Sequence, residues 1–465
     1  MSVAGPGRYH LVGIGGAGMS AIARVLMARG CQVSGSDANP SETTRALERE
    51  GAQVFEGHAA RHVEGAGTVV VSSAVPPGNP EVKRARELGI PVVPRMDMLA
   101  RLMASHRGVG VAGSHGKTTT TAMVGLALLA SGADPTVLVG GEVREFGGNT
   151  RVGSGEYLVA EVDESDGGFV RLKPHSVLIT NVEDDHLECY GSMANMVRAF
   201  EQFLDAACSG VRVVCRDDPR LRRMAEERPG VVTYGLSGEP DFVAADLRVH
   251  GLASRFRVLR RGEELGEVRL SVPGVHNVSN ALGALALTAS LGFPFGPAAR
   301  ALGGFGGVRR RFETVGRAAG VWVVDDYGHH PTEMAATLRV ARSVAEGRLV
   351  CVFQPHRYTR TRQLHRELGA ALSWADLLVV TDVYPAGEAP IPGVSARLVA
   401  EAAEKAGAPA VHFVPDRAEV AGFLAQRLRP GDLVLTLGAG NVWTVGRDLL
   451  RRLEAGGPGE GAGDG

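Results

Sequence analysis

The sequence predicts an α/β protein with three domains and mostly parallel sheets. Strand-like apolar runs alternate with helical patterns throughout the chain, which is typical of α/β layers. The chain has 465 residues, which is long for a single hydrophobic core and suggests about three domains. We therefore expect domains at residues 1–107, 108–314 and 315–454, and a disordered tail at 455–465 that is rich in Gly, Ala, Pro and acidic residues.

The first domain begins with a strand, a glycine loop and a helix. Apolar runs at residues 9–12, 32–37 and 68–73 predict strands. The loop GIGGAG at 13–18 follows the first strand, and Asp37 ends the second, which satisfies the dinucleotide-binding fingerprint of a Rossmann-like domain. This pattern allows an NAD-dependent dehydrogenase. It specifies only a diphosphate at a helix N-terminus and a carboxylate near a ribose, however, and a UDP-sugar carries both groups.

The second domain opens with a phosphate-binding loop. Residues 113–118 read GSHGKT, directly after a predicted buried strand and before a helix of small and apolar residues. In this setting backbone N–H groups and the positive helix end bind phosphate, Lys117 reaches the β/γ oxygens and Thr118 can ligate Mg²⁺. The usual loop has another glycine at the position of Val111, so this is a tightened variant. The loop predicts a P-loop ATPase-like domain that binds a nucleoside triphosphate.

The remaining strands follow from the same patterns. In the central domain, runs at residues 157–160 and 177–180 predict a mostly parallel sheet, and short alternating strands between 211 and 272 predict a small antiparallel sheet. A helix at 278–291 should pack back on this domain. The C-terminal domain is expected to be Rossmann-like, with strands at 321–324, 349–353, 377–380 and 433–436. Polar residues follow these strands, and ligands collect at the carboxyl ends of parallel strands.

Composition argues against several classes of protein. Lys plus Arg number 50 and Asp plus Glu number 51, so no overall charge favours nucleic acid or an anionic membrane. The five cysteines are widely spaced and lack a Cys-x-x-Cys pair, which argues against a disulfide framework and a thiolate metal site. The sequence shows no secretion-signal core and no apolar run of about 20 residues. We expect a cytoplasmic protein that binds neither nucleic acid nor membrane.

Eight short blocks of polar and glycine residues occur in order along the chain. They are the loop at 13–20, the phosphate loop, EVDESD at 161–166, TNVEDDHLE at 180–188, GVHNVSNA at 274–281, RRFE at 310–313, DDYGHHPTE at 325–333 and FQPHRYTR at 353–360. Together they resemble the Mur ligase family, and the match covers nearly the whole chain. Any single block would be weak evidence, whereas eight in family order are specific.

The resemblance implies an ATP-dependent ligase of peptidoglycan precursor synthesis. The blocks are most similar to those of the family member that joins L-alanine to UDP-N-acetylmuramate. In that reaction the lactyl carboxylate attacks the γ-phosphate of ATP, and the amine of L-alanine then displaces phosphate from the acyl phosphate. Apposed anions need cations, so the resemblance implies ATP and two Mg²⁺ ions, for which Mn²⁺ can substitute. We expect a monomer or weak homodimer.

The resemblance also implies where ATP and the metal ions bind. Thr118 and Glu161 hold one ion, and His186 helps to hold a second. The catalytic residues are Lys117, Glu161, His186 and His329. The ATP-binding set is Gly113, Ser114, His115, Gly116, Lys117, Thr118, Thr119, His276, Asn277, Asn280, Arg310, Arg311 and Asp326.

One departure from the family pattern concerns a lysine. Several sister ligases place a carbamoylated lysine beyond the metal-binding histidine, where it supplies a carboxylate to the metal site. This chain has no lysine between Lys173 and Lys405. We hypothesise that Glu201, fifteen residues after His186, supplies the carboxylate directly.

The other ligands are assigned by the same resemblance. The amino-acid set is Tyr327, His329, Arg357 and Arg360, in which an arginine fork suits a free α-carboxylate and His329 orients the amine or accepts its proton. The UDP-sugar set is Gly15, Gly16, Gly18, Met19, Ser20, Asp37, Ser72 and Ser73.

Three alternatives to the alanine-adding ligase remain. They are a sister ligase with another amino acid or peptide acceptor, an NAD-dependent dehydrogenase and a non-catalytic nucleotide switch.

Overall fold

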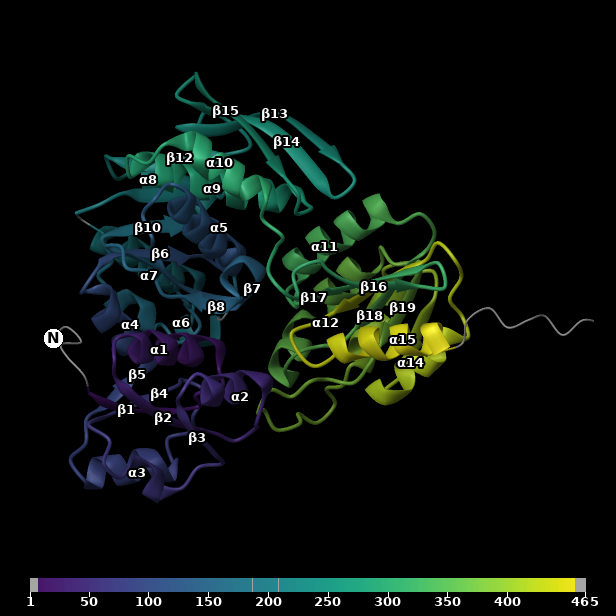
Figure 1. The fold of residues 1–465 in the computed structure, drawn as a ribbon. Helices are drawn as coiled ribbons and strands as arrows, with labels where there is room; N and C mark the ends of the chain where they lie inside the picture. The colour runs from purple at the N-terminus through teal and green to yellow at the C-terminus, as the bar shows by residue number, and fades with distance from the viewer. Residues whose placement is uncertain (1–6, 186, 208, 456–465) are drawn as a thin grey trace, which may run out of the picture. The chain divides into compact units, whose positions relative to one another are not determined.

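The chain folds into three β-sheets with helices packed against them (Figure 1). The computed structural model describes residues 7–185, 187–207 and 209–455, so residues 456–465 of the predicted tail lie outside the described residues. Two compact units are present: residues 7–248 with 254–308, and residues 249–253 with 309–455. The first unit holds two of the sheets and the second unit holds the third. The predicted α/β class with mostly parallel sheets is confirmed.

The first sheet is entirely parallel, in the order β3-β2-β1-β4-β5. Its strands are β1 (Arg8–Val12), β2 (Gln32–Asp37), β3 (Gln53–Glu56), β4 (Thr68–Val71) and β5 (Val92–Pro94). Its helices are α1 (Ala17–Ala28), α2 (Glu42–Arg49), η1 (Ala60–Val63), α3 (Pro80–Glu87) and α4 (Arg95–Met103). Because the strands are parallel, their carboxyl ends share one edge, where the glycine loop after β1 also lies.

The second sheet has ten strands, in the order β15-β14-β13-β12-β11-β10-β6-β9-β7-β8. They are β6 (Arg107–Ala112), β7 (Thr136–Val143), β8 (Gly148–Arg151), β9 (Tyr157–Glu161), β10 (Ser176–Ile179), β11 (Arg212–Cys215), β12 (Val231–Gly235), β13 (Phe242–His250), β14 (Ala253–Arg260) and β15 (Glu263–Leu270). The predicted antiparallel strands are present, but they extend the edge of this sheet rather than forming a sheet of their own. The helical segments are α5 (Lys117–Ala130), η2 (Arg144–Phe146), η3 (Gly168–Arg171), α6 (Leu187–Tyr190), α7 (Met193–Ala206), α8 (Pro219–Glu226), α9 (Val275–Ser290) and α10 (Phe295–Gly303).

The third sheet has the order β16-β17-β21-β18-β19-β20, and only β16 runs antiparallel to its neighbour. Its strands are β16 (Glu313–Ala318), β17 (Val321–Asp326), β18 (Leu349–Phe353), β19 (Leu377–Val380), β20 (Val411–Phe413) and β21 (Leu433–Leu437). Its helices are α11 (Pro331–Val344), α12 (Tyr358–Leu372), α13 (Arg397–Lys405), α14 (Arg417–Ala425) and α15 (Trp443–Ala455).

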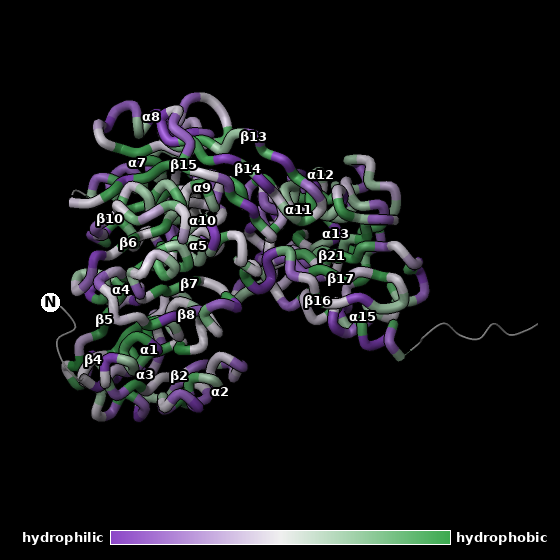
Figure 2. Tube along the Cα trace, turned by 45° about the horizontal axis from the view of Figure 1, so that its top comes forward, coloured by the Kyte–Doolittle hydropathy of each residue, from purple (hydrophilic) through white to green (hydrophobic). Residues whose placement is uncertain are grey.

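A hydrophobic core continues through both sheets of the first unit. Helix α1 contributes to it and appears as a largely hydrophobic segment in Figure 2. The second unit has separate clusters on the two faces of its sheet. Within the described part of the chain, no helix combines the length and apolarity needed to cross a bilayer.

Candidate functional site

The phosphate loop connects β6 to α5 and is braced by the segment after β10. Gly113 has φ +132°, and a Cβ there would lie 2.1 Å from Oγ1 of Thr180, so only glycine fits. The Thr180 hydroxyl donates to the carbonyl of His115 at 2.6 Å. The backbone N–H of His115 donates to Oδ1 of Asn181 at 2.8 Å. These contacts hold the loop in shape at the start of α5, where its N–H groups can receive phosphate.

Lys117 is held by a buried carboxylate. Its Nζ donates to Oε1 of Glu164 at 2.8 Å and to the carbonyls of Gly113 and Ser114 at 2.6 and 3.0 Å. Burial by itself lowers the pKa of Lys117, but the carboxylates of Glu164 and Asp163 outweigh it, so the pKa is raised. The ammonium group is therefore charged and fixed at the loop that is predicted to bind the β/γ-phosphates.

The hydroxyl of Thr118 and the carboxylate of Glu161 lie together at the same edge. Thr118 Oγ1 donates to Glu161 Oε1 at 3.0 Å, and the N–H of Gly140 donates to Glu161 Oε2 at 2.6 Å. Hydroxyl and carboxylate oxygens are the ligands that Mg²⁺ prefers, so these two residues fit the predicted metal site. The predicted metal ligand His186 lies outside the described residues.

Glu201 lies on α7, where its carboxylate Oε1 is 3.8 Å from Nη2 of Arg228. Among the residues described, Glu201 belongs to no cluster of metal-ligating side chains. Its role as a substitute for a carbamoylated lysine stays a hypothesis.

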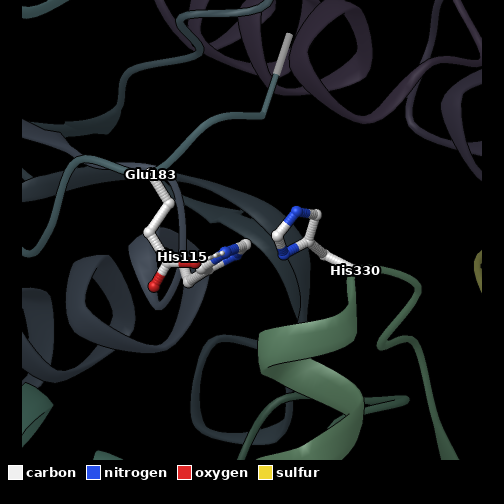
Figure 3. A group of neighbouring side chains, drawn as sticks. All are labelled: His115, Glu183 and His330. Atoms are coloured by element: carbon white, nitrogen blue, oxygen red, sulfur yellow. Dashed lines mark ion pairs between the residues drawn. The ribbon is translucent and has the colours of Figure 1, made fainter. Parts of the chain in front are cut away.

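The other predicted ATP residues of the first unit lie in the phosphate loop, at the start of α5 and in the first two turns of α9. His115 Nε2 lies 3.4 Å from Oε2 of Glu183, and Figure 3 shows the two side chains together. Asn280 packs against the loop, since a Cβ on Gly116 would lie 2.6 Å from its Oδ1. Asn280 also donates to Oδ1 of Asn277 at 3.1 Å. Thr119 lies in the first turn of α5, and His276 lies in the first turn of α9.

The glycine loop after β1 is shaped by Asp37. The N–H of Gly15 donates to Asp37 Oδ2 at 2.9 Å, and a Cβ on Gly15 would lie 2.8 Å from the same oxygen. Gly16 is the N-cap of α1. Ser72 and the exposed Ser73 follow β4 at the same sheet edge. The N–H groups of residues 13–16 are all engaged within the protein, so the part of this segment that suits a diphosphate is the N-terminus of α1, which begins at Ala17.

Two members of the predicted UDP-sugar set face the interior. Met19 is 1 % exposed and packs in the core, and Ser20 is fully buried. The Ser20 hydroxyl donates to the carbonyl of Ala17 at 3.0 Å. These two side chains therefore pack α1 against the core and bond to its backbone.

Sequence reasoning missed a buried carboxylate near this loop. Glu81 is fully buried; it accepts hydrogen bonds from Ser36 Oγ at 2.6 Å and lies 2.7 Å from His62 Nδ1 and 3.7 Å from His10 Nε2. Burial by itself raises the pKa of Glu81, but the interactions of its carboxylate with His10, Ser36 and His62 outweigh it and lower the pKa to about 2. His58, which follows β3, also lies against Glu81, at 3.1 Å. Only the recurrence of histidines at 58 and 62 signalled this cluster in the sequence.

In the second unit, the predicted arginines gather around Tyr327. The guanidinium groups of Arg310 and Arg311 lie 5.0 and 5.3 Å from the centre of the Tyr327 ring. Arg310 also donates to Asp325 Oδ2 at 3.0 Å and to the carbonyl of Gly438 at 2.6 Å. Residues predicted for ATP and for the amino acid therefore share one sheet edge in this unit.

Asp326 braces the backbone at that edge. Its two carboxylate oxygens accept the N–H groups of Gly328 and Phe312 at 2.7 and 2.8 Å. Burial raises the pKa of Asp326 to about 6, against the opposing charge of Arg311. These hydrogen bonds stabilise a segment in which Phe312 has φ +48°.

The predicted amino-acid residues lie at the ends of β17 and β18. The rings of Tyr327 and His329 are 5.5 Å apart, and His329 lies 5.5 Å from His356. Arg357 has φ +70°, an uncommon conformation for a residue with a side chain, and its N–H donates to the carbonyl of Tyr384 at 2.9 Å. Arg360 follows in the first turn of α12. Strained backbone that the surrounding fold over-determines is typical of ligand sites.

Three family models match the chain in succession. They are described as the Mur ligase family catalytic domain at residues 8–107, the Mur ligase middle domain at 111–288 and the Mur ligase glutamate ligase domain at 310–440. The chain belongs to the Mur ligase family. Membership in this family favours a ligase over the NAD-dependent dehydrogenase that the glycine loop alone allowed.

Relatives and solved structures match this Mur ligase over nearly its full length. The UDP-N-acetylmuramate–L-alanine ligase of Rubrobacter xylanophilus is 49 % identical, with 96 % of this chain and 100 % of the relative covered. The ligase of the same description from Pelotomaculum thermopropionicum is 47 % identical, with 96 % and 97 % covered. The crystal structure of a UDP-N-acetylmuramate–alanine ligase from Thermotoga maritima is 32 % identical, with a TM-score of 0.84 and coverage of 97 % and 100 %.

Proposed function

We propose that this Mur ligase joins L-alanine to UDP-N-acetylmuramate at the expense of ATP, in cytoplasmic synthesis of peptidoglycan precursors. The observation that carries the proposal is the phosphate loop, with Lys117 fixed by Glu164 and with paired oxygen ligands on Thr118 and Glu161. End-to-end similarity to relatives described as UDP-N-acetylmuramate–L-alanine ligases supports the choice of substrates.

The proposed chemistry proceeds in two transfers. A lactyl carboxylate oxygen attacks the γ-phosphorus of ATP, the bond to the bridging oxygen of ADP breaks, and an acyl phosphate forms. The neutral amine of L-alanine then attacks the acyl carbon, loses a proton and expels phosphate. Lys117 and the N–H groups of the loop bind the β/γ oxygens and stabilise the charge that develops during transfer. Bound Mg²⁺ would screen the repulsion between phosphate and carboxylate.

The second unit is proposed to bind the amino acid. Arg357 and Arg360 offer guanidinium donors for its α-carboxylate, and His329 orients the amine or accepts its proton. We propose two Mg²⁺ ions per site and a monomer or weak homodimer. Specificity for alanine over glycine rests on one methyl group, which is worth about 1–3 kcal/mol in a pocket, so glycine is expected to react slowly.

A phosphate-release assay with ATP, UDP-N-acetylmuramate and a panel of amino acids tests the proposal. Release should require all three substrates and should be fastest with L-alanine. Release that ignores the sugar nucleotide would overturn the assignment. A preference for another amino acid or a peptide would identify a sister ligase instead.

A further inference from the structure

Arg95 lies between the glycine loop of the first sheet and the carboxylates beside the phosphate loop. It is the first residue of α4, directly after β5. Because the first sheet is entirely parallel, Arg95 lies at the carboxyl edge of this sheet, where the glycine loop after β1 also lies. The sequence alone gave no reason to single it out.

The Arg95 side chain passes directly over the glycine loop. A Cβ on Gly18 would lie 2.8 Å from Nη1 of Arg95 and 3.2 Å from its Cδ. Glycine at this position therefore leaves room for the guanidinium group. The positive charge of Arg95 therefore lies within one turn of the N-terminus of α1, where a diphosphate is predicted to bind.

The same guanidinium group reaches the segment that follows β9 in the second sheet. Its Nη2 donates to Oδ2 of Asp163 at 3.1 Å, and the side chains of Arg95 and Asp163 are 15 % and 39 % exposed. Asp163 lies between Glu161, which contacts Thr118, and Glu164, which binds Lys117.

We propose that Arg95 binds anionic oxygens of the sugar nucleotide, either its diphosphate or its acceptor carboxylate, and so guides this substrate from the glycine loop toward the phosphate loop. This inference rests on the proposed function. A planar guanidinium with five donors can keep one contact to Asp163 while another nitrogen binds the substrate. It supplies positive charge where a second anion must approach ATP.

A neighbouring ion pair provides a matched control. Arg171 Nε donates to Asp97 Oδ1 at 2.7 Å, and this pair also ties α4 to the central part of the unit. Both partners are more than one third exposed. If Arg95 served only as a tie, Arg95→Gln and Arg171→Gln should have the same consequences.

Calorimetric titration of the full-length protein tests the inference. Arg95→Gln should weaken binding of UDP-N-acetylmuramate by about 10- to 100-fold, the range for loss of a charge-assisted hydrogen bond, and should leave the Kd for Mg-ATP unchanged. Arg95→Lys should recover part of the affinity, and Arg171→Gln should bind like the wild type. Thermal midpoints confirm that each variant is folded.

The choice of ligand separates the two anions. UDP-N-acetylglucosamine lacks the lactyl carboxylate, so an equal loss with this ligand assigns Arg95 to the diphosphate, and a loss confined to UDP-N-acetylmuramate assigns it to the carboxylate. Unchanged affinity of folded Arg95→Gln for both ligands, or an equal loss in Arg171→Gln, would overturn the inference. If the wild type binds neither ligand, the proposed function fails instead.

Discussion

Replacing Lys117 with methionine should destabilise the fold as well as abolish ligation. The side chain of Glu164 is 1 % exposed, and its Oε1 lies 2.8 Å from Lys117 Nζ. Methionine fills much of the same space but leaves this carboxylate buried without its counter-charge. Removing one partner of a buried ion pair costs about 3–5 kcal/mol, and we expect the free energy of unfolding of the first unit to fall by about that amount at neutral pH.

The loss should grow as pH rises. Burial raises the pKa of Glu164, and without Lys117 no ammonium group opposes this effect. A carboxyl whose pKa is raised by folding destabilises the fold above its unfolded pKa, by about 1.4 kcal/mol per pH unit until the folded pKa is reached. The deficit of Lys117→Met should therefore increase above about pH 4.5. The double variant Lys117→Met/Glu164→Gln should lack this increase and recover part of the stability, yet remain inactive.

Denaturant titrations followed by circular dichroism measure the unfolding free energies, and phosphate release measures activity. Lys173→Met is the control, because this exposed lysine undergoes the same substitution and should change stability by no more than about 0.5 kcal/mol. Wild-type stability of Lys117→Met at alkaline pH would refute the reasoning about the buried pair. An active double variant would refute the role given to Lys117.

Four further predictions test separate parts of the structure. Folding lowers the pKa of Glu81 from 4.5 to about 2. Its contribution of about 3 kcal/mol to the free energy of unfolding is therefore present above pH 4.5 and is lost as pH falls toward 2. In denaturant titrations, Glu81→Gln should remove this dependence on acid. Folding raises the pKa of Asp326 from 3.8 to about 6, so the free energy of unfolding should fall by about 3 kcal/mol as pH rises between these values. Asp326→Asn should flatten the dependence of the unfolding free energy on pH in this range. Thr118→Val should weaken Mg-dependent ATP binding about tenfold in calorimetry while Thr118→Ser retains it, and equal binding by both would contradict the metal assignment. If Glu201 replaces a carbamoylated lysine, removal of bicarbonate should leave the rate unchanged; a bicarbonate requirement rejects that hypothesis.

The sequence predicted those parts of the fold that depend on local pattern. Apolar runs predicted β4, β18 and β19, whereas the three-residue strand β5 was missed because so short a run carries little periodicity. The helix expected from residue 278 begins at Val275, because Gly274, with φ +96°, allows the chain to turn directly into α9.

The candidate site was predictable only where a motif specifies a contact. The phosphate loop named Lys117 and Thr118, because their chemistry follows from their spacing. The EVDESD block did not reveal that Glu164, rather than Glu161, pairs with Lys117. Arg95 and Glu81 depend on contacts between segments far apart in the chain, which no local pattern encodes.

Isotope transfer from substrate to phosphate tests the central claim most directly. UDP-N-acetylmuramate with both oxygens of its lactyl carboxylate isotopically labelled is incubated with ATP, Mg²⁺, L-alanine and the enzyme. The masses of the products are then measured by mass spectrometry. Activation of the carboxylate by ATP predicts that one labelled oxygen appears in inorganic phosphate and the other stays in the new amide. Phosphate that is released without label while UDP-N-acetylmuramoyl-L-alanine forms would contradict the account.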